Sequence, residues 1–454
     1  MNNRVRELSR LDKKYLWHPF TQMKDWMSDD ILVISRAKGN YLYDTDNRAY
    51  LDGVSSLWCN VHGHGRPEIN NAIRRQLGRV AHSTMLGLAN IPAIELARQL
   101  IGIAPQGLTR VFYSDSGSTA VEIALKMAFQ FWQQAPGNHK VNARKTKFLT
   151  FANAYHGDTI GSVSLGGMDL FHAAYKPMLF RTIRALAPYC YRCPLKLERT
   201  TCKISCLAAA EQLIKKHCRE LAAVVIEPLI QGAAGMITQP VGFLKRLRRL
   251  CTEHNILLVT DEVATGFGRT GRMFACEHES IRPDIMTVAK GITGGYLPLA
   301  ATITTEKIFN AFLGRAEDKK TFFHGHTYTG NPLACAAALA NLEIFRQEQT
   351  IRRLQLKIRR LKERLEKFHN LPNVGDIRQC GFMAGIELVR SKKTKEPYPY
   401  EIRMGHRVIL EARKFGIILR PLGDVIVLIP PLSITNRQLE FLLDSAYRAI
   451  EKTS

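Results

Sequence analysis

Lys290 stands at the end of a short apolar stretch, residues 285–288, and is followed by a glycine-rich loop. A lysine in that position is difficult to explain by packing alone. When its amine is partly desolvated, its pKa falls and it can form a Schiff base with an aldehyde. The residue type and its setting therefore indicate carbonyl chemistry at Lys290, although Lys290 on its own leaves a structural role open.

Two carboxylates follow another apolar stretch, in residues 256–263 (ILLVTDEV). Asp261 and Glu262 would lie at the carboxyl edge of a sheet, which is where open α/β folds bind ligands. A carboxylate at that edge can keep the ring nitrogen of pyridoxal phosphate (PLP) protonated, so that the ring accepts electrons. A pair of metal ligands or a capping residue is the alternative interpretation.

Two further segments have the composition of anion-binding turns. Residues 115–119 (DSGST) open a predicted helix, and a helix N-terminus presents unpaired N–H groups and the positive end of its dipole to a phosphate. An ordinary N-cap is the alternative. Residues 325–332 (GHTYTGNP) contain two glycines and several hydroxyls, and they could form a second anion-binding turn.

The elements that must position these side chains alternate along the chain. Helical periodicity predicts helices over 90–100 and 118–132, and short apolar runs predict buried strands at 148–151, 222–226, 256–259 and 285–288. Such alternation predicts an α/β fold with a mostly parallel sheet covered by helices on both faces. Beyond about residue 332, long helices and short strands near 382–389 and 425–428 indicate a smaller α+β domain.

The composition is that of a soluble globular protein, with 46% hydrophobic and 23% charged residues among 454. We expect no membrane partner, because no apolar run approaches the roughly 18–20 residues of a membrane span. Residues 1–14 are charged and lack the apolar stretch of a secretory signal. The net charge of +24 is compatible with nucleic-acid binding. The scattered charges favour a generally basic surface and no nucleic-acid partner, and the densest run, 352–367, has amphipathic spacing.

The chain has ten cysteines, which together with the missing signal suggest reduced thiols and a cytoplasmic location. Four of them are clustered and could hold a structural zinc ion: Cys190, Cys193, Cys202 and Cys206. The three residues that separate the second pair are more than the usual two. We therefore prefer an inserted loop with free thiols, no bound metal, and zinc as the alternative.

Read together, these motifs resemble a known family. Residues 260–271 (TDEVATGFGRTG), followed by 289–291 (AKG), are similar to the class III (ω-) aminotransferases of PLP fold type I. The resemblance also covers 115–118, 155–157 and 329–335, and thus nearly the whole chain. It implies a PLP enzyme with a large domain over 66–332 and a small domain over 333–454, and an N-terminal segment over 1–65 that belongs with the small domain.

Within that family, residues 16–23 (LWHPFTQM) and 52–58 (DGVSSLW) are similar to the branch that converts 8-amino-7-oxononanoate to 7,8-diaminononanoate in biotin synthesis. The resemblance implies a ping-pong reaction through pyridoxamine phosphate, with S-adenosylmethionine or lysine as amino donor. The alternatives are a class III enzyme for another ω-amino acid (ornithine, γ-aminobutyrate or β-alanine) and, more remotely, a non-catalytic basic binding protein.

The resemblance assigns PLP to Gly117, Ser118, Tyr155, Glu227, Asp261, Lys290, His326 and Thr327. Lys290, Asp261 and Tyr155 are the catalytic residues in this assignment. Lys290 holds PLP and moves the proton, Asp261 pairs with the ring nitrogen, and Tyr155 stacks on the ring. His326 and Thr327 would reach the phosphate of the partner subunit, because this family forms its sites across the interface of a homodimer.

The resemblance also implies a substrate site formed by Phe20, Trp58, Tyr155, Lys290, Gly325 and Arg420. Arg420 would bind the carboxylate of the oxononanoate through two parallel hydrogen bonds; a surface arginine is the alternative. Branch members that use S-adenosylmethionine typically have tyrosine, tryptophan and tyrosine where this chain has Phe20, Leu57 and Val427. This pattern favours lysine as the amino donor, but the resemblance leaves the choice between lysine and S-adenosylmethionine open.

Overall fold

A computed structural model describes residues 3–135 and 142–453 of the chain. Its centre is a seven-stranded sheet, and the only antiparallel pairings in that sheet are those of β12 with its two neighbours. In spatial order the strands are β4 (Leu108–Ser114), β12 (Ala300–Thr305), β11 (Ile285–Val288), β10 (Leu257–Asp261), β7 (Leu221–Ile226), β5 (Lys147–Phe151) and β6 (Ile183–Ala185). The prediction of a mostly parallel sheet is confirmed.

Helices cover both faces of this sheet. Successive residues of one strand point to opposite faces, so Val225 packs into the core of α6 while Val224 packs into the core of α10 and α11. Both faces are therefore buried, which is why the central strands are continuously apolar. The helices of this part are α4 (Pro67–Leu77), α5 (Ile91–Ile103), α6 (Gly117–Gln134), α8 (Ile160–Leu165), α9 (Asp169–His172), α10 (Ser205–His217), α11 (Phe243–Glu253), α12 (Glu306–Ala311) and α13 (Pro332–Gln347).

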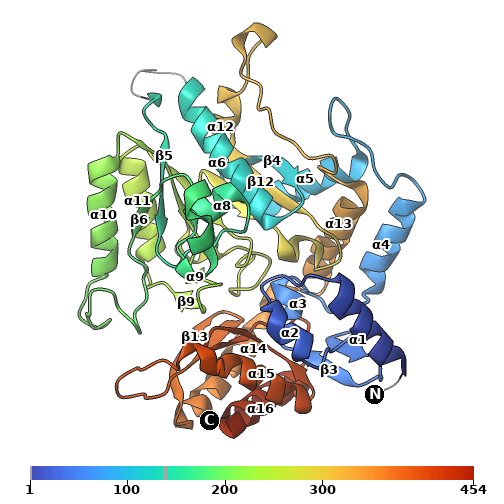
Figure 1. Ribbon diagram of the computed structural model, residues 1–454. Coiled ribbons are helices and arrows are strands. Elements are labelled where there is room, and N and C mark those ends of the chain that lie inside the picture. Colours follow the sequence, from blue (N-terminus) through green and yellow to red (C-terminus); the bar gives the residue numbers. More distant parts are fainter. Residues whose placement is uncertain (1–2, 136–141, 454) are drawn as a thin grey trace.

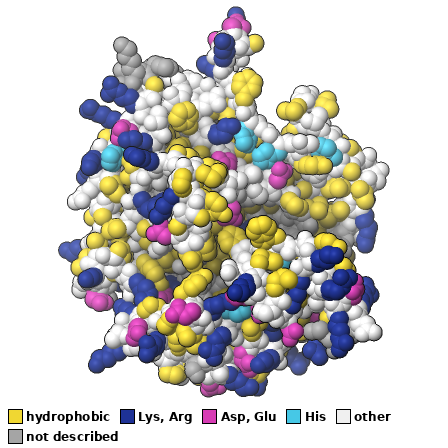
Figure 2. All heavy atoms as spheres, in the orientation of Figure 1, with side chains coloured by type: hydrophobic (Ala, Val, Ile, Leu, Met, Phe, Trp, Pro, Cys, Tyr) yellow, Lys and Arg dark blue, Asp and Glu magenta, His cyan; other side chains and the backbone are white. Residues whose placement is uncertain are grey.

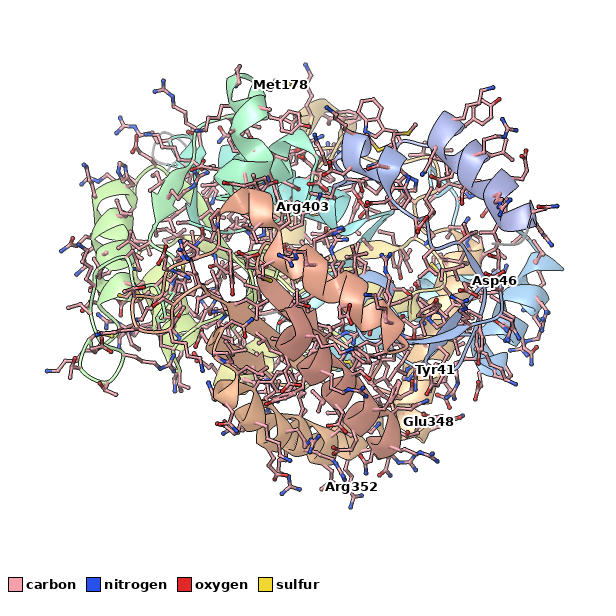
Figure 3. The ribbon with its side chains drawn as sticks, turned by 60° about the horizontal axis from the view of Figure 1, so that its bottom comes forward. Tyr41, Asp46, Met178, Glu348, Arg352 and Arg403 are labelled. Carbon is pink, nitrogen blue, oxygen red and sulfur yellow. The ribbon has the colours of Figure 1, made fainter. Side chains whose placement is uncertain are left out.

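The C-terminal elements lie below the large sheet in Figure 1, in orange and red. An antiparallel sheet has the order β13 (Val374–Cys380), β14 (Met383–Leu388), β17 (Val425–Leu428) and β16 (Arg420–Leu422). Its helices are α14 (Thr350–Leu365), α15 (Met404–Lys414) and α16 (Asn436–Thr453). Arg352, labelled in Figure 3, belongs to α14, whose basic exposed face and buried Leu354, Leu361 and Leu365 confirm the predicted amphipathic helix.

The two ends of the chain meet in one further sheet. Its strands are β1 (Ile34–Lys38), β2 (Tyr41–Asp44), β3 (Ala49–Asp52) and β15 (Ile417–Ile418), and β15 runs parallel to β3. Before and after this sheet the N-terminal part forms α1 (Asn3–Tyr15), α2 (Met23–Ser28) and the short α3 (Ser55–Trp58). These blue elements lie beside the C-terminal elements in Figure 1. Residues 1, 2, 136–141 and 454 of the expected domains lie outside the described residues.

The surface agrees with the expectation of scattered charge. In Figure 2, lysine and arginine side chains are spread over the whole visible face, and acidic side chains lie among them. Within residues 3–135 and 142–453, no helix combines the length and the apolar character required to cross a membrane.

Candidate active site

A cavity of about 600 Å³ lies where the central strands end. Asp261 is the last residue of β10, and Glu227 and Lys290 follow β7 and β11 closely. Parallel strands end at one edge of their sheet, so the fold brings these separated residues to one place. Figure 2 shows the surface hollowed between the large sheet and the C-terminal elements. The predicted site residues that line this cavity are Phe20, Trp58, Gly117, Ser118, Tyr155, Glu227, Asp261, Lys290 and Arg420.

The amine of Lys290 faces the cavity without a hydrogen-bond partner among the described residues. Its Nζ lies 4.7 Å from the centroid of the Trp58 ring. Burial lowers the pKa of Lys290, and the negative charges of Asp261 and Glu227 only partly oppose this. A lysine with a lowered pKa has a larger neutral fraction, which is the form that attacks a carbonyl carbon.

Asp261 is held by His156, a residue to which the sequence analysis gave no role. Nδ1 of His156 lies 2.7 Å from Oδ2 of Asp261, while Thr287 donates to Oδ1 at 3.2 Å. Burial alone would lower the pKa of His156, but the hydrogen bond and charge of Asp261 outweigh burial and raise it. The pair therefore keeps a proton next to the Asp261 carboxylate. The segment Tyr155–Gly157 after β5 was the available signal, because its histidine directly follows a predicted site residue.

Glu227 lies on the cavity wall and supports the backbone beside it. Its carboxyl oxygens accept hydrogen bonds from the backbone N–H of Tyr155 at 3.1 Å and of Gly232 at 2.9 Å. Burial raises the pKa of Glu227 to about 7. The side chain thus fixes the backbone that carries Tyr155, whose hydroxyl donates to Asp158 at 2.8 Å.

The N-terminus of α6 forms a narrow polar cradle. Ser116 caps the helix, and the hydroxyl of Ser118 accepts a hydrogen bond from the Thr159 N–H at 2.9 Å. A Cβ added to Gly117 would lie 2.5 Å from Val263, and one added to Gly157 would lie 2.4 Å from Ser118. Only glycine allows this approach, so backbone N–H groups line the cradle.

The wall formed by Leu57 and Trp58 has an unusual backbone. All four residues of α3 have positive φ, namely 51° at Ser55, 48° at Ser56, 79° at Leu57 and 67° at Trp58. Each L-residue in a left-handed conformation costs about 1–2 kcal/mol. No glycine or asparagine marks this turn in the sequence, so sequence patterns do not predict it.

Arg420 lies at the boundary between this cavity and a second one of about 860 Å³, which also contacts Phe20 and Leu57. Burial lowers the pKa of Arg420, with a smaller opposing effect from Tyr155. No carboxylate pairs with its guanidinium within residues 3–135 and 142–453. In contrast Arg403, labelled in Figure 3, lines only the second cavity and forms an ion pair with Asp25.

Three predicted site residues, Gly325, His326 and Thr327, do not line the cavity of their own chain. Instead, Nδ1 of His326 lies 2.7 Å from Oδ2 of Asp115, at the outer side of the cradle. Val427 also differs from the expectation of a residue facing the donor. Its side chain is fully buried in an apolar cluster with Trp58, behind the cavity wall.

The cysteine cluster provides no preformed metal site. Cys190, Cys193, Cys202 and Cys206 are unpaired and half-buried around a space of about 20 Å³. In the described part of the chain, no group of three or more histidine, cysteine or acidic side chains is placed to hold a metal ion. Burial raises the pKa of Cys206 to about 11, which opposes the thiolate that zinc requires. The structure therefore offers nothing in favour of the zinc alternative.

The residues around the main cavity fit PLP. They offer an unpaired lysine amine for its aldehyde, a buried carboxylate for its ring nitrogen, and a glycine-lined helix N-terminus for its phosphate. Glycine at 117 and 157 lets the neighbouring segments approach closely around this helix N-terminus, because a Cβ at these positions would clash with Val263 and Ser118, respectively.

Known proteins resemble this chain over its length. The model of the family aminotransferase class-III matches residues 23–450. A protein of Nitratidesulfovibrio vulgaris named adenosylmethionine-8-amino-7-oxononanoate aminotransferase is 60% identical, and the match covers 99% of this chain and 82% of that protein. A protein of the same name from Geobacter sulfurreducens is 53% identical, with 97% and 96% covered.

Solved structures agree with these matches. The crystal structure of adenosylmethionine-8-amino-7-oxononanoate aminotransferase from Methanocaldococcus jannaschii has a TM-score of 0.93 and 47% identity, covering 98% of this chain and 99% of that chain. An (S)-enantioselective omega-transaminase from Thermomicrobium roseum also has a TM-score of 0.93, at 34% identity, covering 99% and 98%.

Proposed function

Because the chain belongs to the class III aminotransferases, which are PLP-dependent enzymes of fold type I, we propose that it transfers an amino group to 8-amino-7-oxononanoate. The product is 7,8-diaminononanoate, an intermediate of biotin synthesis. The names of relatives at 53–60% identity support this acceptor.

One observation in the structure carries the proposal. Lys290 and the unpaired Arg420 line the same cavity, and the apolar side chains of Phe20, Leu57 and Trp58 form its walls. An oxononanoate has a reactive carbonyl, an apolar carbon chain and a terminal carboxylate. A guanidinium binds a carboxylate in two parallel hydrogen bonds. The cavity therefore offers one kind of group for each part of this substrate: an amine for the carbonyl, apolar side chains for the carbon chain and a guanidinium for the carboxylate.

The chain's own residues have distinct tasks in the proposed reaction. When bound, PLP serves as the electron sink and carries the amino group between the two half-reactions. Lys290 would bind its aldehyde and would later move a proton to and from the substrate carbon. Asp261, held by His156, would keep the ring nitrogen protonated. Tyr155, on the cavity wall, would cover the ring, and Gly117 and Ser118 would bind the phosphate with backbone N–H groups of α6.

The amino donor is S-adenosylmethionine or lysine. The relatives are named for adenosylmethionine. Phe20 and Leu57, both on the cavity wall, lack the polar and aromatic groups that the adenosylmethionine-using branch typically has there. Val427 lies behind the wall, so it can influence the donor only through the wall residues that it packs against, Trp58 among them.

The active form is a homodimer with shared sites. Two large apolar side chains on separate segments are strongly exposed, Leu86 at 83% and Phe323 at 81%. Phe323 lies on the segment between α12 and α13, which projects from the molecule in Figure 1 and contains Gly325, His326 and Thr327. Exposed apolar patches of this kind mark association surfaces. Docking this segment on a second copy would bring the three residues to the partner's site.

The enzyme acts in the cytoplasm in this proposal. The support is chemical: all ten cysteines are described, and all are unpaired. Free thiols persist in a reducing compartment.

The test is turnover by the purified, PLP-reconstituted protein. The protein is incubated with 8-amino-7-oxononanoate and either donor, and the diamine is measured by mass spectrometry. Formation of 7,8-diaminononanoate with one of the donors is the expected result.

A second candidate function is that of an aminotransferase for another ω-amino acid. The likeness to the omega-transaminase of Thermomicrobium roseum favours it, since the same fold serves other amines. Conversion of ornithine, γ-aminobutyrate or β-alanine, without conversion of the oxononanoate, would establish this function instead.

A further inference from the structure

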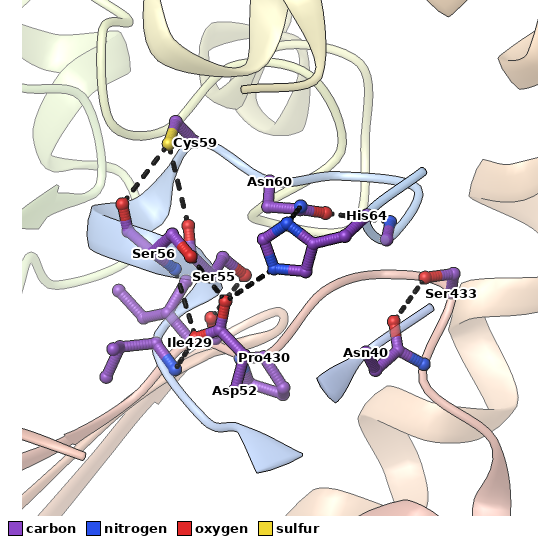
Figure 4. A network of polar contacts seen from close by, with 12 residues as sticks. Asn40, Asp52, Ser55, Ser56, Cys59, Asn60, His64, Ile429, Pro430 and Ser433 are labelled. Carbon is purple, nitrogen blue, oxygen red and sulfur yellow. Dashed lines mark hydrogen bonds and ion pairs between the residues drawn. The ribbon is translucent and has the colours of Figure 1, made fainter. Parts of the chain in front are cut away.

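The left-handed turn Ser55–Trp58 is clamped by a buried carboxylate, as Figure 4 shows. Asp52 is fully buried at the end of β3. Its Oδ1 accepts hydrogen bonds from the backbone N–H of Val54 at 3.2 Å and of Ser56 at 3.0 Å. Its Oδ2 accepts the hydroxyl of Ser56 at 2.7 Å. A single carboxylate thus holds the first half of the turn.

His64 completes the clamp in one defined tautomer. Its Nε2 lies 3.3 Å from Oδ2 of Asp52, and its Nδ1 lies 3.0 Å from Nδ2 of Asn60. The N–H of Gly63 donates to Oδ1 of Asn60, which fixes the amide with its nitrogen toward His64. Since an amide nitrogen only donates, Nδ1 of His64 accepts and Nε2 donates to Asp52.

Separate contacts fix the first residue of the turn and its far end. The hydroxyl of Ser55 donates to the carbonyl of Ile429 at 2.6 Å. The buried Arg269 donates to the carbonyls of Trp58 at 3.3 Å and Asn60 at 2.8 Å. Because both ends are held, the turn cannot relax without breaking several buried hydrogen bonds. A strained backbone persists where surrounding contacts hold it in this way.

The strained turn places two side chains at the substrate cavities. Trp58 lies against Lys290, and Leu57, which is 48% exposed, contacts both the main cavity and the second one. A right-handed or extended backbone over these residues would direct their side chains elsewhere. Strained residues that line a ligand site point to a role in that site.

We propose that Asp52 and His64 are positioning residues for substrate selection, which hold the left-handed turn so that Leu57 separates the two cavities and Trp58 faces Lys290. This inference deepens the proposed aminotransferase function and rests on it. Neither residue touches substrate in this proposal, because both act through the backbone of the turn.

Asp44 offers a matched control in the same sheet. It is also buried, and its Oδ1 accepts hydrogen bonds from the backbone N–H of Asp46 at 2.9 Å and of Arg48 at 2.8 Å. The turn that it holds connects β2 and β3 and contacts neither cavity. Asp44→Asn therefore reports what the loss of a structural carboxylate alone does.

The experiment compares the PLP-bound Asp52→Asn and Asp44→Asn enzymes by the donor concentration that bleaches half of the visible PLP band. Asparagine keeps one acceptor oxygen for the backbone but loses the charged acceptor for Ser56 and His64. We expect Asp52→Asn to keep its visible band and to need about 10- to 100-fold more donor, as for one lost charge-assisted hydrogen bond. Asp44→Asn should need the wild-type amount.

A rescue variant separates positioning from stability. Glycine takes positive φ without strain, so Ser56→Gly added to Asp52→Asn should bring the donor requirement back to within about 3-fold of Ser56→Gly alone. Equal losses in the Asp52 and Asp44 variants, or no recovery with glycine, would overturn the inference.

Two provisions keep the test decisive. If Asp52→Asn does not fold, two variants of His64 test the clamp instead. His64→Ala removes the hydrogen bond to Asp52 and should raise the required concentration of amino donor, whereas His64→Gln keeps an N–H group for Asp52 and should not. Equal behaviour of the two variants would overturn the inference. Because the bleaching assay needs no oxononanoate, failure of the wild type to aminate that acceptor would contradict the proposed function while the clamp is still tested.

Discussion

At the scale of single residues, a change at Arg420 should affect binding of the acceptor and not the chemistry at Lys290. It is the unpaired guanidinium on the wall of the main cavity. Arg420→Ala removes a charged hydrogen-bond partner worth about 1.5–3 kcal/mol, so KM for the oxononanoate should rise about 10- to 100-fold. KM for the donor should change much less. Steady-state kinetics with each substrate varied in turn measures both effects.

Arg403→Ala is the matched control, because Arg403 lines only the second cavity and is already paired with Asp25. An equal rise of both KM values in the Arg420 variant would remove the assignment of Arg420 as a clamp for the acceptor carboxylate.

Glu227 makes the stability of the protein depend on pH. Its pKa is raised by burial to about 7 in the folded state, against an ordinary value of 4.5. Between these values the folded state keeps a proton that the unfolded state has released, so raising the pH through this window destabilises the fold. Above about pH 7 the contribution no longer changes.

Glu227→Gln should abolish this loss of stability with rising pH, because glutamine has no proton to release. The difference in unfolding free energy between variant and wild type should grow by about 1–3 kcal/mol from pH 5 to pH 8. Urea unfolding at several pH values, without added PLP, measures it. Glu253→Gln, at a half-exposed ion pair on α11, serves as control. Parallel pH profiles of the Glu227 variant and the wild type would show that burial of this carboxyl group does not shift its pKa.

At the scale of elements, the phosphate cradle depends on the approach of two segments. Gly157 has a φ of +119°, and a Cβ there would lie 2.4 Å from Ser118 at the start of α6. Gly157→Ala should therefore weaken PLP binding by about 5- to 100-fold, since overpacking typically costs about 1–3 kcal/mol. Absorbance titration of the apoenzyme with PLP measures the dissociation constant.

Gly107→Ala provides the control for backbone strain. Gly107 has a φ of +101°, but a Cβ there would meet no atom within 4 Å. Unchanged PLP affinity in Gly157→Ala, or equal weakening in both variants, would show that the cradle does not need this close contact.

Sequence patterns predicted the elements that carry the chemistry. The apolar strands β7, β10 and β11 are buried on both faces, so their composition alone identifies them, and Glu227, Asp261 and Lys290 follow at their ends. The domain boundaries stay a prediction. The pairing of β15 with β3 could not be predicted, because these strands are very short and far apart in the chain.

The features that sequence reasoning missed depend on three-dimensional context. His156 becomes a partner of Asp261 only when β5 and β10 end at the same edge of the sheet. The positive φ values of Ser55–Trp58 have no glycine or asparagine as a signal, and they are held by the nearby Asp52 together with the distant Arg269. Val427 was expected near the donor, but its burial behind Trp58 follows from the packing of β17.

At the scale of the whole molecule, shared sites in a homodimer allow two inactive variants to complement each other. Lys290→Ala removes the amine, and Thr327→Glu would place a negative charge near the partner's phosphate. Each variant alone should be inactive. In a hybrid dimer, one site contains both changes and the other contains neither. An equal mixture refolded together should therefore recover about one quarter of wild-type activity.

Recovery is measured by turnover after co-refolding, with the separately refolded variants as controls. A mixture that stays inactive, although hybrid dimers form, would place Thr327 outside the partner's site. Activity of the Thr327→Glu homodimer would likewise place Thr327 outside the partner's site.

In the proposed reaction, this aminotransferase delivers its amino group to 8-amino-7-oxononanoate. The most direct measurement follows the visible band of the PLP enzyme through two separate half-reactions. Lysine or S-adenosylmethionine is added first, without acceptor, until the band is bleached; the donor is then removed and the oxononanoate is added. We predict that the oxononanoate restores the band and leaves as 7,8-diaminononanoate. A band that the oxononanoate leaves bleached, but that the keto product of another ω-amino acid restores, would show that 8-amino-7-oxononanoate is not the acceptor.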